Sequence, residues 1–292
     1  MQHRISPIQR PHNFTSKRMR QAMWRIPSLI ILLIWVALVA LPLWILLSIA
    51  VKSAQEELTN PLGWPHTIQW GNFTTAWDSA GLDTAFFNSI MITSISVICL
   101  VVFGALAAYP LARSTATWSR NIYLYFVSGF VLPGGLGLVA LYKELQTLGL
   151  LDNQLGIMLL EVSGGLPFVI FLYTGFIKTV PRELEEAALI DGAGPLRTFW
   201  QIVFPLLTPI TATVIIVSSL GIWNDFFSPL LFLQSSDKQT IPVAIYSFVG
   251  QYNNQWTSIF SAIVLSLVPI IVLFLVLQRY FIRGIAGGAL KG

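Results

Sequence analysis

Long apolar runs alternate with short polar segments along the 292 residues of this chain. Several runs reach the roughly 20 residues that a helix needs to cross about 30 Å of hydrocarbon. A helix satisfies its own backbone hydrogen bonds in lipid, so we expect six transmembrane helices. The predicted spans are 28–51, 86–111, 122–145, 155–177, 210–233 and 259–282. The pattern predicts an all-α, polytopic membrane domain over 28–284, between an amino-terminal tail, 1–27, and a carboxy-terminal tail, 285–292.

The composition supports a membrane protein. Hydrophobic residues make up 55% of the chain and charged residues only 10%, whereas charged residues in soluble domains approach roughly a quarter. The first apolar run is too long for the core of a signal peptide, and no small-residue cleavage site follows it. We therefore expect this run to be retained as a membrane anchor.

Basic residues are distributed unevenly between the predicted loops. The amino-terminal tail carries Arg4, Arg10, Lys17, Arg18, Arg20 and Arg25 and no acidic residue. Because Lys and Arg in short loops stay on the cytoplasmic side, this tail is predicted to be cytoplasmic. An even number of spans then places the carboxy terminus there too. Only Lys52, Lys143 and Lys238 fall outside, so the net charge of +4 indicates topology, and a nucleic-acid partner is not needed to explain it.

The sequence lacks the common signatures of enzymes. It contains no G-x-x-x-x-G-K-[ST] loop for ATP, no H-E-x-x-H and no G-x-S-x-G. The only cysteine, Cys99, has no histidine partner, and His3, His12 and His66 share no metal-binding spacing. We therefore expect this chain to have no catalytic residues and to bind no metal or cofactor.

The segment 178–205, between the fourth and fifth predicted spans, is predicted to form a helix, a turn and a second helix. Three glutamates at 183, 185 and 186 favour the positive end of a first helix, and 191–195 breaks it. A second amphipathic run, 196–203, ends at Phe204-Pro205. Such a hairpin either lies on the membrane surface or docks with a cytoplasmic partner. The glutamates favour the partner, because a lipid-binding face would be basic.

The same segment carries a motif: Glu186-Ala187-Ala188, three residues, Gly192, nine residues, then Ile-Val-Phe-Pro at 202–205. It resembles the E-A-A-x3-G-x9-I-x-L-P loop of permeases from bacterial binding-protein-dependent ABC importers, with Phe204 in place of the usual leucine. The resemblance extends over most of the chain from about Asn72 onward. It narrows to the carbohydrate branch, the second permease of maltose-type importers. The supporting stretches are 87–89, 190–193, 221–226, 241–243 and 278–292.

This resemblance implies a type I ABC importer permease in the bacterial inner membrane, whose 178–205 loop couples it to an ATPase. The carboxy-terminal Lys291 and Gly292 would also reach the ATPase. The implied partners are a second permease, two ATPase subunits that hold ATP and Mg, an extracytoplasmic sugar-binding protein, a carbohydrate substrate and membrane lipid. The implied coupling residues are Glu186, Ala187, Ala188, Asp191, Gly192, Ile202 and Pro205.

Candidate substrate-pathway residues lie inside the spans. Ionisable groups are costly in lipid, so Glu161 and Asp225 are expected to face the bundle interior or water. Breaks are predicted at 164–167 in the fourth span and at 133–135 in the third, where Gly and Pro either line a cavity or serve helix packing. Trp223-Asn224-Asp225 either binds sugar or anchors the structure. The candidate pathway residues are Glu161, Gly164, Pro167, Trp223, Asn224 and Asp225.

Two other functional classes are considered, an ion-coupled secondary transporter or channel and a membrane enzyme. The sequence shows no internal repeat, which disfavours a secondary transporter built from inverted repeats. Two predicted external segments, 52–84 and 234–256, carry aromatic residues. These residues either form an interfacial belt, stack on a ligand or dock an external protein.

Overall fold

The computed structural model describes residues 14–131, 137–250 and 255–289, and within them the side chains of 27–129, 137–250 and 255–278. Every regular element among these residues is a helix, which confirms the all-α prediction. The long helices are α1 (Phe14–Ala50), α4 (Leu82–Arg113), α5 (Thr117–Val131), α6 (Leu138–Thr147), α7 (Gln154–Ile177), α11 (Thr208–Trp223) and α14 (Trp256–Ala289).

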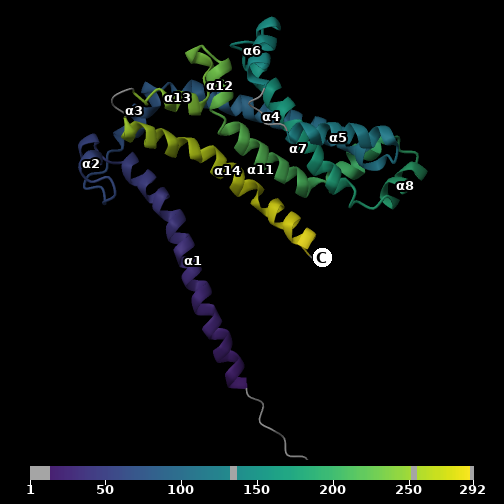
Figure 1. The fold of residues 1–292 in the computed structure, drawn as a ribbon, viewed down its shortest axis with the longest axis horizontal. Coiled ribbons are helices and arrows are strands. Elements are labelled where there is room, and N and C mark those ends of the chain that lie inside the picture. Colours follow the sequence, from purple (N-terminus) through teal and green to yellow (C-terminus); the bar gives the residue numbers. More distant parts are fainter. Residues whose placement is uncertain (1–13, 132–136, 251–254, 290–292) are drawn as a thin grey trace, which may run out of the picture.

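Short helices gather at the two ends of the bundle. At one end lie α2 (Ala54–Thr59), α3 (Gly71–Ser79), α12 (Phe227–Phe232), η3 (Ser236–Lys238) and α13 (Ile241–Tyr246). The other end carries α8 (Glu183–Ile190), α9 (Pro195–Thr198), the π-helical turn η2 (Phe199–Val203) and α10 (Phe204–Leu206). Figure 1 shows α8 at the right-hand end and α2 and α3 at the left-hand end.

The number of membrane-spanning helices agrees only in part with the predicted six. Four helical stretches in the described residues are long and apolar enough to span a membrane: Pro27–Ala50, Leu82–Arg113, Gln154–Ile177 and Trp256–Gln278. A fifth is counted only if α11 is joined to Pro195–Leu206, from which it is bent by 75°. The third predicted span corresponds to α5 and α6, and the predicted break at 133–135 between them lies outside the described residues.

The structure corrects two predictions, the break within the fourth span and the extent of the fifth span. The fourth span is not interrupted at 164–167, because α7 is helical throughout and contains Pro167. Glycine and proline are tolerated in membrane helices when neighbouring helices cover them, and Gly165 lies against Leu100 of α4. The fifth predicted span, 210–233, is instead broken between Trp223, the end of α11, and Phe227, the start of α12.

The centre of the fold is the α4–α7 pair, the most extensive contact between helices in the described part of the chain. Small residues on α4, Gly104 with Ala105 and Ala108, allow close approach. A Cβ on Gly104 would overlap Cγ1 of Val169, which is fully buried on α7. The hydroxyl of Tyr173 on α7 donates to Thr211 Oγ1 at 2.9 Å, which adds α11 to this core.

Helix α1 lies apart from this core. None of the residues in its most apolar stretch is buried, and the helix points away from the other long helices (Figure 1). Only its carboxy-terminal end is held. The carbonyl of Ala50 accepts from Asn72 Nδ2 at 3.0 Å and from Ser261 Oγ of α14 at 2.8 Å.

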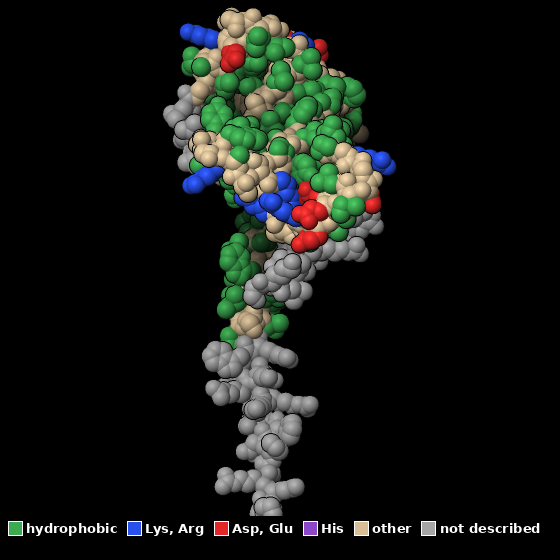
Figure 2. All heavy atoms as spheres, turned by 90° about the vertical axis from the view of Figure 1, so that its right-hand side faces the viewer, with side chains coloured by type: hydrophobic (Ala, Val, Ile, Leu, Met, Phe, Trp, Pro, Cys, Tyr) green, Lys and Arg blue, Asp and Glu red, His purple; other side chains and the backbone are tan. Residues whose placement is uncertain are grey.

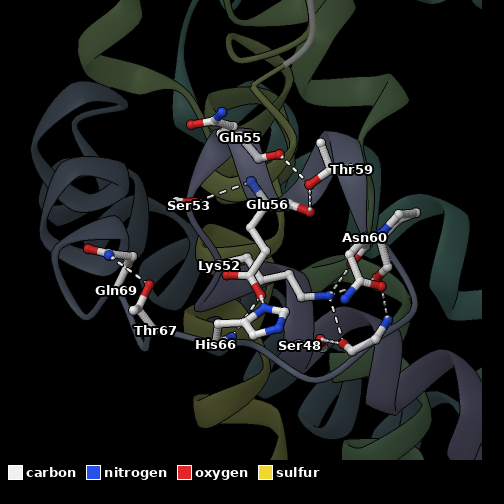
Figure 3. Close-up of polar contacts among 12 residues, drawn as sticks. Ser48, Lys52, Ser53, Gln55, Glu56, Thr59, Asn60, His66, Thr67 and Gln69 are labelled. Atoms are coloured by element: carbon white, nitrogen blue, oxygen red, sulfur yellow. Dashed lines mark hydrogen bonds and ion pairs between the residues drawn. The ribbon is translucent and has the colours of Figure 1, made fainter.

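A buried lysine, Lys52, holds the loop that follows α1 through hydrogen bonds to the loop backbone (Figure 3). The ammonium of Lys52 donates to the carbonyls of Asn60 at 2.7 Å, Pro61 at 3.1 Å and Gly63 at 2.8 Å. These three acceptors match the three protons of an ammonium group, so a fully buried charge is satisfied without a direct ion pair. The position of Lys52 is therefore fixed by its own loop.

A second contact beside it joins α2 to the loop. The Glu56 carboxylate accepts from the backbone N–H of His66 at 2.7 Å, and His66 Nδ1 lies 2.8 Å from the same oxygen. The backbone hydrogen bond is the largest cause that lowers the pKa of Glu56 below its ordinary value. The charged carboxylate thus helps to fix the loop.

Candidate functional site

The segment between α7 and α11 forms the predicted helical hairpin, and its turn depends on glycine. Gly192 has φ +79°, the left-handed conformation that its position after Asp191 predicts. Its N–H donates to Leu189 at 3.1 Å, and the next N–H, of Ala193, donates to Ala188 at 2.9 Å. These two bonds form a Schellman motif, which ends α8 and turns the chain sharply.

The second half of the hairpin is less regular than its apolar pattern predicts. After α9 the chain forms the π turn η2, in which the Phe204 N–H donates to the carbonyl of Phe199. The helix does not end at Phe204-Pro205, as expected, but continues to Leu206. Pro205, which has no N–H, stands directly before Leu206, the last residue of this helical stretch.

Burial divides the hairpin into an inner and an outer face. The inner face packs into the chain through Ala188, Phe199 and Val203, all buried. The outer face exposes large apolar side chains, with Ile190 86% and Leu196 68% exposed. Such side chains are costly in water, so this face requires a partner or a lipid surface.

The predicted coupling residues divide between the two faces. Ala188 faces its own chain, so its side chain does not form an outer surface. Ile202 is partly buried. The exposed members are Glu186, Ala187, Asp191, Gly192 and Pro205. The sequence motif did not identify Ile190 and Leu196 as exposed, because an apolar residue on a short helix gives no sign of which way it faces.

Charged side chains accompany this hairpin. Figure 2 views the molecule from the end that carries α8 and shows Lys or Arg side chains directly beside Asp or Glu side chains on a largely hydrophobic face. Glu185 of α8 forms an ion pair with Arg113, the last residue of α4. Arg113 and Glu185 are far apart in the chain, so no sequence motif predicts that they form a pair.

The candidate pathway residues of α7 line a shallow cavity with α11. Glu161, Gly164 and Gly165 face Ser218 and Gly221 across a cavity of about 260 Å³. The Glu161 carboxyl lies close enough to the Asp225 carboxyl to interact with it. The fold therefore brings together the two acidic residues that were expected to avoid lipid.

The other pathway candidates are engaged with the backbone. Trp223 is buried, and its indole N–H donates to the Ser266 carbonyl of α14 at 3.1 Å. The Asn224 amide donates to Leu220 at 2.8 Å. One oxygen of Asp225 accepts from the N–H groups of Phe227 at 3.0 Å and Ser228 at 3.3 Å, which caps α12. This arrangement favours the anchoring alternative for this triplet.

At the opposite end of the bundle, Asp152 joins two loops. It accepts from the hydroxyl and N–H of Ser235, from the N–H of Gln234 and from the ammonium of Lys238 at 2.9 Å. These contacts, led by the Ser235 hydroxyl, hold the pKa of Asp152 well below its ordinary value. Two of the three lysines predicted outside, Lys52 and Lys238, are thus held by oxygen atoms of the chain. Lys291 and Gly292 lie outside the described residues.

Comparison with known proteins decides the family. Residues 13–287 match the family described as binding-protein-dependent transport system inner membrane component. The chain belongs to this family. The predicted resemblance is therefore confirmed, and the chain is a multi-pass permease subunit of an ABC importer.

Individual relatives agree with this assignment. The chain is 39% identical to the melibiose/raffinose/stachyose import permease protein MelC of Bacillus subtilis over 92% of this chain and 99% of that protein. It is 34% identical to the diacetylchitobiose uptake system permease protein NgcG of Streptomyces coelicolor over 89% of this chain and 87% of that protein. The fold matches a chain of a bacterial ABC transporter for the polysaccharide alginate. In that match the TM-score is 0.78 and the identity 23%, over 93% of this chain and all of that chain.

Proposed function

We propose that this chain is one of two permease subunits of an importer for a sugar or oligosaccharide, and that it has no catalytic activity. Two ATPase subunits that bind ATP and Mg would supply the energy, and an extracytoplasmic binding protein would deliver the sugar. The names of the relatives support the substrate class, because they include import permeases for melibiose, raffinose, stachyose and diacetylchitobiose.

The observation that carries the proposal is the outer face of the hairpin. The hairpin exposes Ile190 at the end of α8 and Leu196 in α9, and it also exposes Glu186 and Asp191. Such a surface suits an apolar groove with basic residues on a partner protein. The exposed acidic residues of α8, Glu183 and Glu186, are unsuited to anionic lipid, which argues against a passive interfacial hairpin. The carboxy-terminal Lys291 and Gly292 are proposed as a second contact with the ATPase.

In the proposed mechanism the ATPase binds this outer face and moves the hairpin. Closure of the ATPase pair on ATP draws the coupling hairpins of the two permeases together and turns the central cavity outward, so that the sugar can enter. Hydrolysis resets the transporter. A partner shifts a two-state equilibrium only by its different affinity for the two states, so the ATPase has to hold the hairpin differently in each.

For the substrate pathway we propose the α7–α11 cavity. Its floor of Gly164, Gly165 and Gly221 leaves room at the helix surface, and Glu161 and Ser218 provide polar groups for sugar hydroxyls. Pro167 lies one helical turn from this floor and supports the shape of α7. Asp225 acts here through its contact with Glu161, while Trp223 and Asn224 position the end of α11.

We also propose that both termini and the hairpin face the cytoplasm. In support, the described residues of the two segments predicted to be external lie at the same end of the bundle, where Ser261 of α14 bonds to Ala50, the last residue of α1. The hairpin lies at the other end (Figure 1).

Reconstitution in vesicles tests the function. With the second permease, the ATPase and the binding protein present, labelled melibiose, raffinose or stachyose should accumulate only with ATP. The competing class, an ion-coupled transporter or channel, predicts uptake by this chain alone under a proton or sodium gradient. Such uptake would replace the importer proposal.

A matched pair of glycine variants tests the hairpin. Gly192→Val forces a β-branched residue into φ +79°, a strain of roughly 1–2 kcal/mol that is too small to unfold the bundle but large enough to displace the hairpin. Gly194 is also open to added atoms, but its backbone is extended, so Gly194→Val is the control. Gly192→Val should leave membrane abundance unchanged while reducing ATPase co-purification and uptake together. Normal values of both would show that the hairpin is not the coupling element.

A further inference from the structure

The carboxylate of Glu185 is held on both of its oxygens by α4. Arg113 Nε donates to Oε1 at 2.8 Å, and the Tyr109 hydroxyl donates to Oε2 at 2.8 Å. The side chains of Arg113 and Glu185 are only 14% and 12% exposed. Ion pairs shielded in this way are screened less than surface pairs and hold a more defined geometry.

Further contacts bind the same end of α4 to the rest of the hairpin. Arg113 Nη2 also donates to the Val180 carbonyl at 3.0 Å, and Arg182 Nη2 donates back to the carbonyl of Arg113 at 3.0 Å. A guanidinium at the last carbonyl of a helix interacts favourably with the helix dipole. The ring of Tyr109 lies 5.2 Å from that of Phe199, so α4 contacts both halves of the hairpin.

These contacts connect the hairpin to α4, which is not its neighbour in the sequence. In sequence the hairpin is joined to α7 and α11 only. Near its other end, α4 holds residues 236–241, which run from η3 to the first residue of α13. Asn88 Nδ2 donates to the carbonyls of Asp237 at 2.9 Å and Gln239 at 3.0 Å, and Ser89 Oγ accepts from the N–H of Ile241 at 2.9 Å. Helix α4 therefore forms hydrogen bonds with the hairpin near one end and with the 236–241 segment near the other.

We propose that the Arg113–Glu185 pair is a latch that makes α4 carry movement of the coupling hairpin to the 236–241 segment at the opposite end of the bundle. Arg113, Glu185 and Tyr109 are then positioning residues for transport, and they are distinct from the exposed Glu186 of the loop motif. This inference rests on the proposed function, because it requires the ATPase to move the hairpin.

Labelling of a single cysteine tests the latch without knowledge of the sugar. Ser236→Cys is introduced into a Cys99→Ser chain, the importer is assembled with its ATPase, and the rate of reaction with a maleimide is measured with and without Mg and the ATP analogue AMP-PNP. The analogue should change the rate at least about fivefold, and Glu185→Gln should reduce this change to less than about twofold. The exposed Glu183→Gln on the same helix is the control and should respond like the parent. The exchanged pair Arg113→Glu with Glu185→Arg should restore part of the response.

The outcomes separate the latch from a merely structural role and from the proposed function. A Glu185→Gln importer that co-purifies with its ATPase and keeps the full response would overturn the latch. Where Glu185→Gln does not assemble, Tyr109→Phe decides, because it removes one hydrogen bond and keeps the ring: a reduced response supports the latch and a full response overturns it. A parent importer that takes up sugar with ATP but never responds to AMP-PNP would overturn the latch and leave the proposed function standing, whereas a parent without ATP-dependent uptake would refute the proposed function.

Discussion

Helices α1 and α4 are similar in hydropathy but opposite in their packing. Their most apolar windows have mean hydropathies of 3.0 and 2.6, yet none of the α1 window is buried, against 39% of the α4 window. The difference lies in the kinds of residue. Helix α4 carries small and polar residues such as Asn88, Ser96 and Gly104 on its buried face, whereas the exposed stretch of α1 consists mostly of large aliphatic and aromatic residues, with only Ala37 and Ala40 as small apolar ones.

The comparison teaches how helices associate in lipid. Large apolar side chains gain little by leaving lipid for another helix, so close packing and interhelical hydrogen bonds determine which helices associate. Hydropathy predicts that a helix enters the membrane, and small or polar residues predict that it packs within its own chain. Helix α1 is therefore available to lipid or to another subunit.

The largest effect is expected at Gly104, the closest approach in the α4–α7 pair. Gly104→Val should destabilise the chain by about 3 kcal/mol, because its added atoms meet a buried β-branched side chain, Val169, that cannot easily move. Gly175→Val on α7 is the control, since a Cβ there meets no atom within 4 Å. Thermal unfolding in detergent would measure both. Equal unfolding temperatures for the two variants would show that α4 and α7 are less closely packed at Gly104 than in the structure.

A smaller effect is expected where α1 joins the bundle. Lys52→Met keeps the length of the side chain but leaves three carbonyls without their donor, at a cost of about 2 kcal/mol because water can reach some of them. The effect should be confined to the loop after α1, so proteolysis within 53–66 should accelerate while the unfolding of the bundle changes little. The exposed Lys143→Met is the control. A Lys52→Met loop as protease-resistant as that of the parent would mean that the ammonium is not its main support.

The smallest effects come from leucine truncations that compare the two helices directly. Leu100→Ala, at a buried site on α4, should cost about 1 kcal/mol, less than in water-soluble cores because lipid replaces water as the reference medium. Leu38→Ala, 61% exposed on α1, should leave the stability of the isolated chain unchanged. If Leu38→Ala instead lowers stability only when the second permease is present, then α1 packs on that subunit.

By itself the sequence determined the membrane location, the helical fold, the family and the hairpin with its positive-φ Gly192. The physical reasons are local or additive: apolar runs are long enough to span lipid, backbone polar groups require helices there, and a helix that turns at glycine needs a left-handed residue. The loop motif at 186–205 lies within one short stretch of sequence, so it can be identified without knowledge of the fold.

Only the tertiary structure decided which residues meet. The contacts of Glu185 with Arg113 and Tyr109, of Asp152 with Ser235 and Lys238, and of Glu161 with Asp225 join residues far apart in the chain. The structure also decided that α7 continues through Pro167, that Ala188 faces inward and that α1 stands apart. Each depends on which neighbour covers a side chain or a freed backbone group, and no periodicity along one helix contains that information.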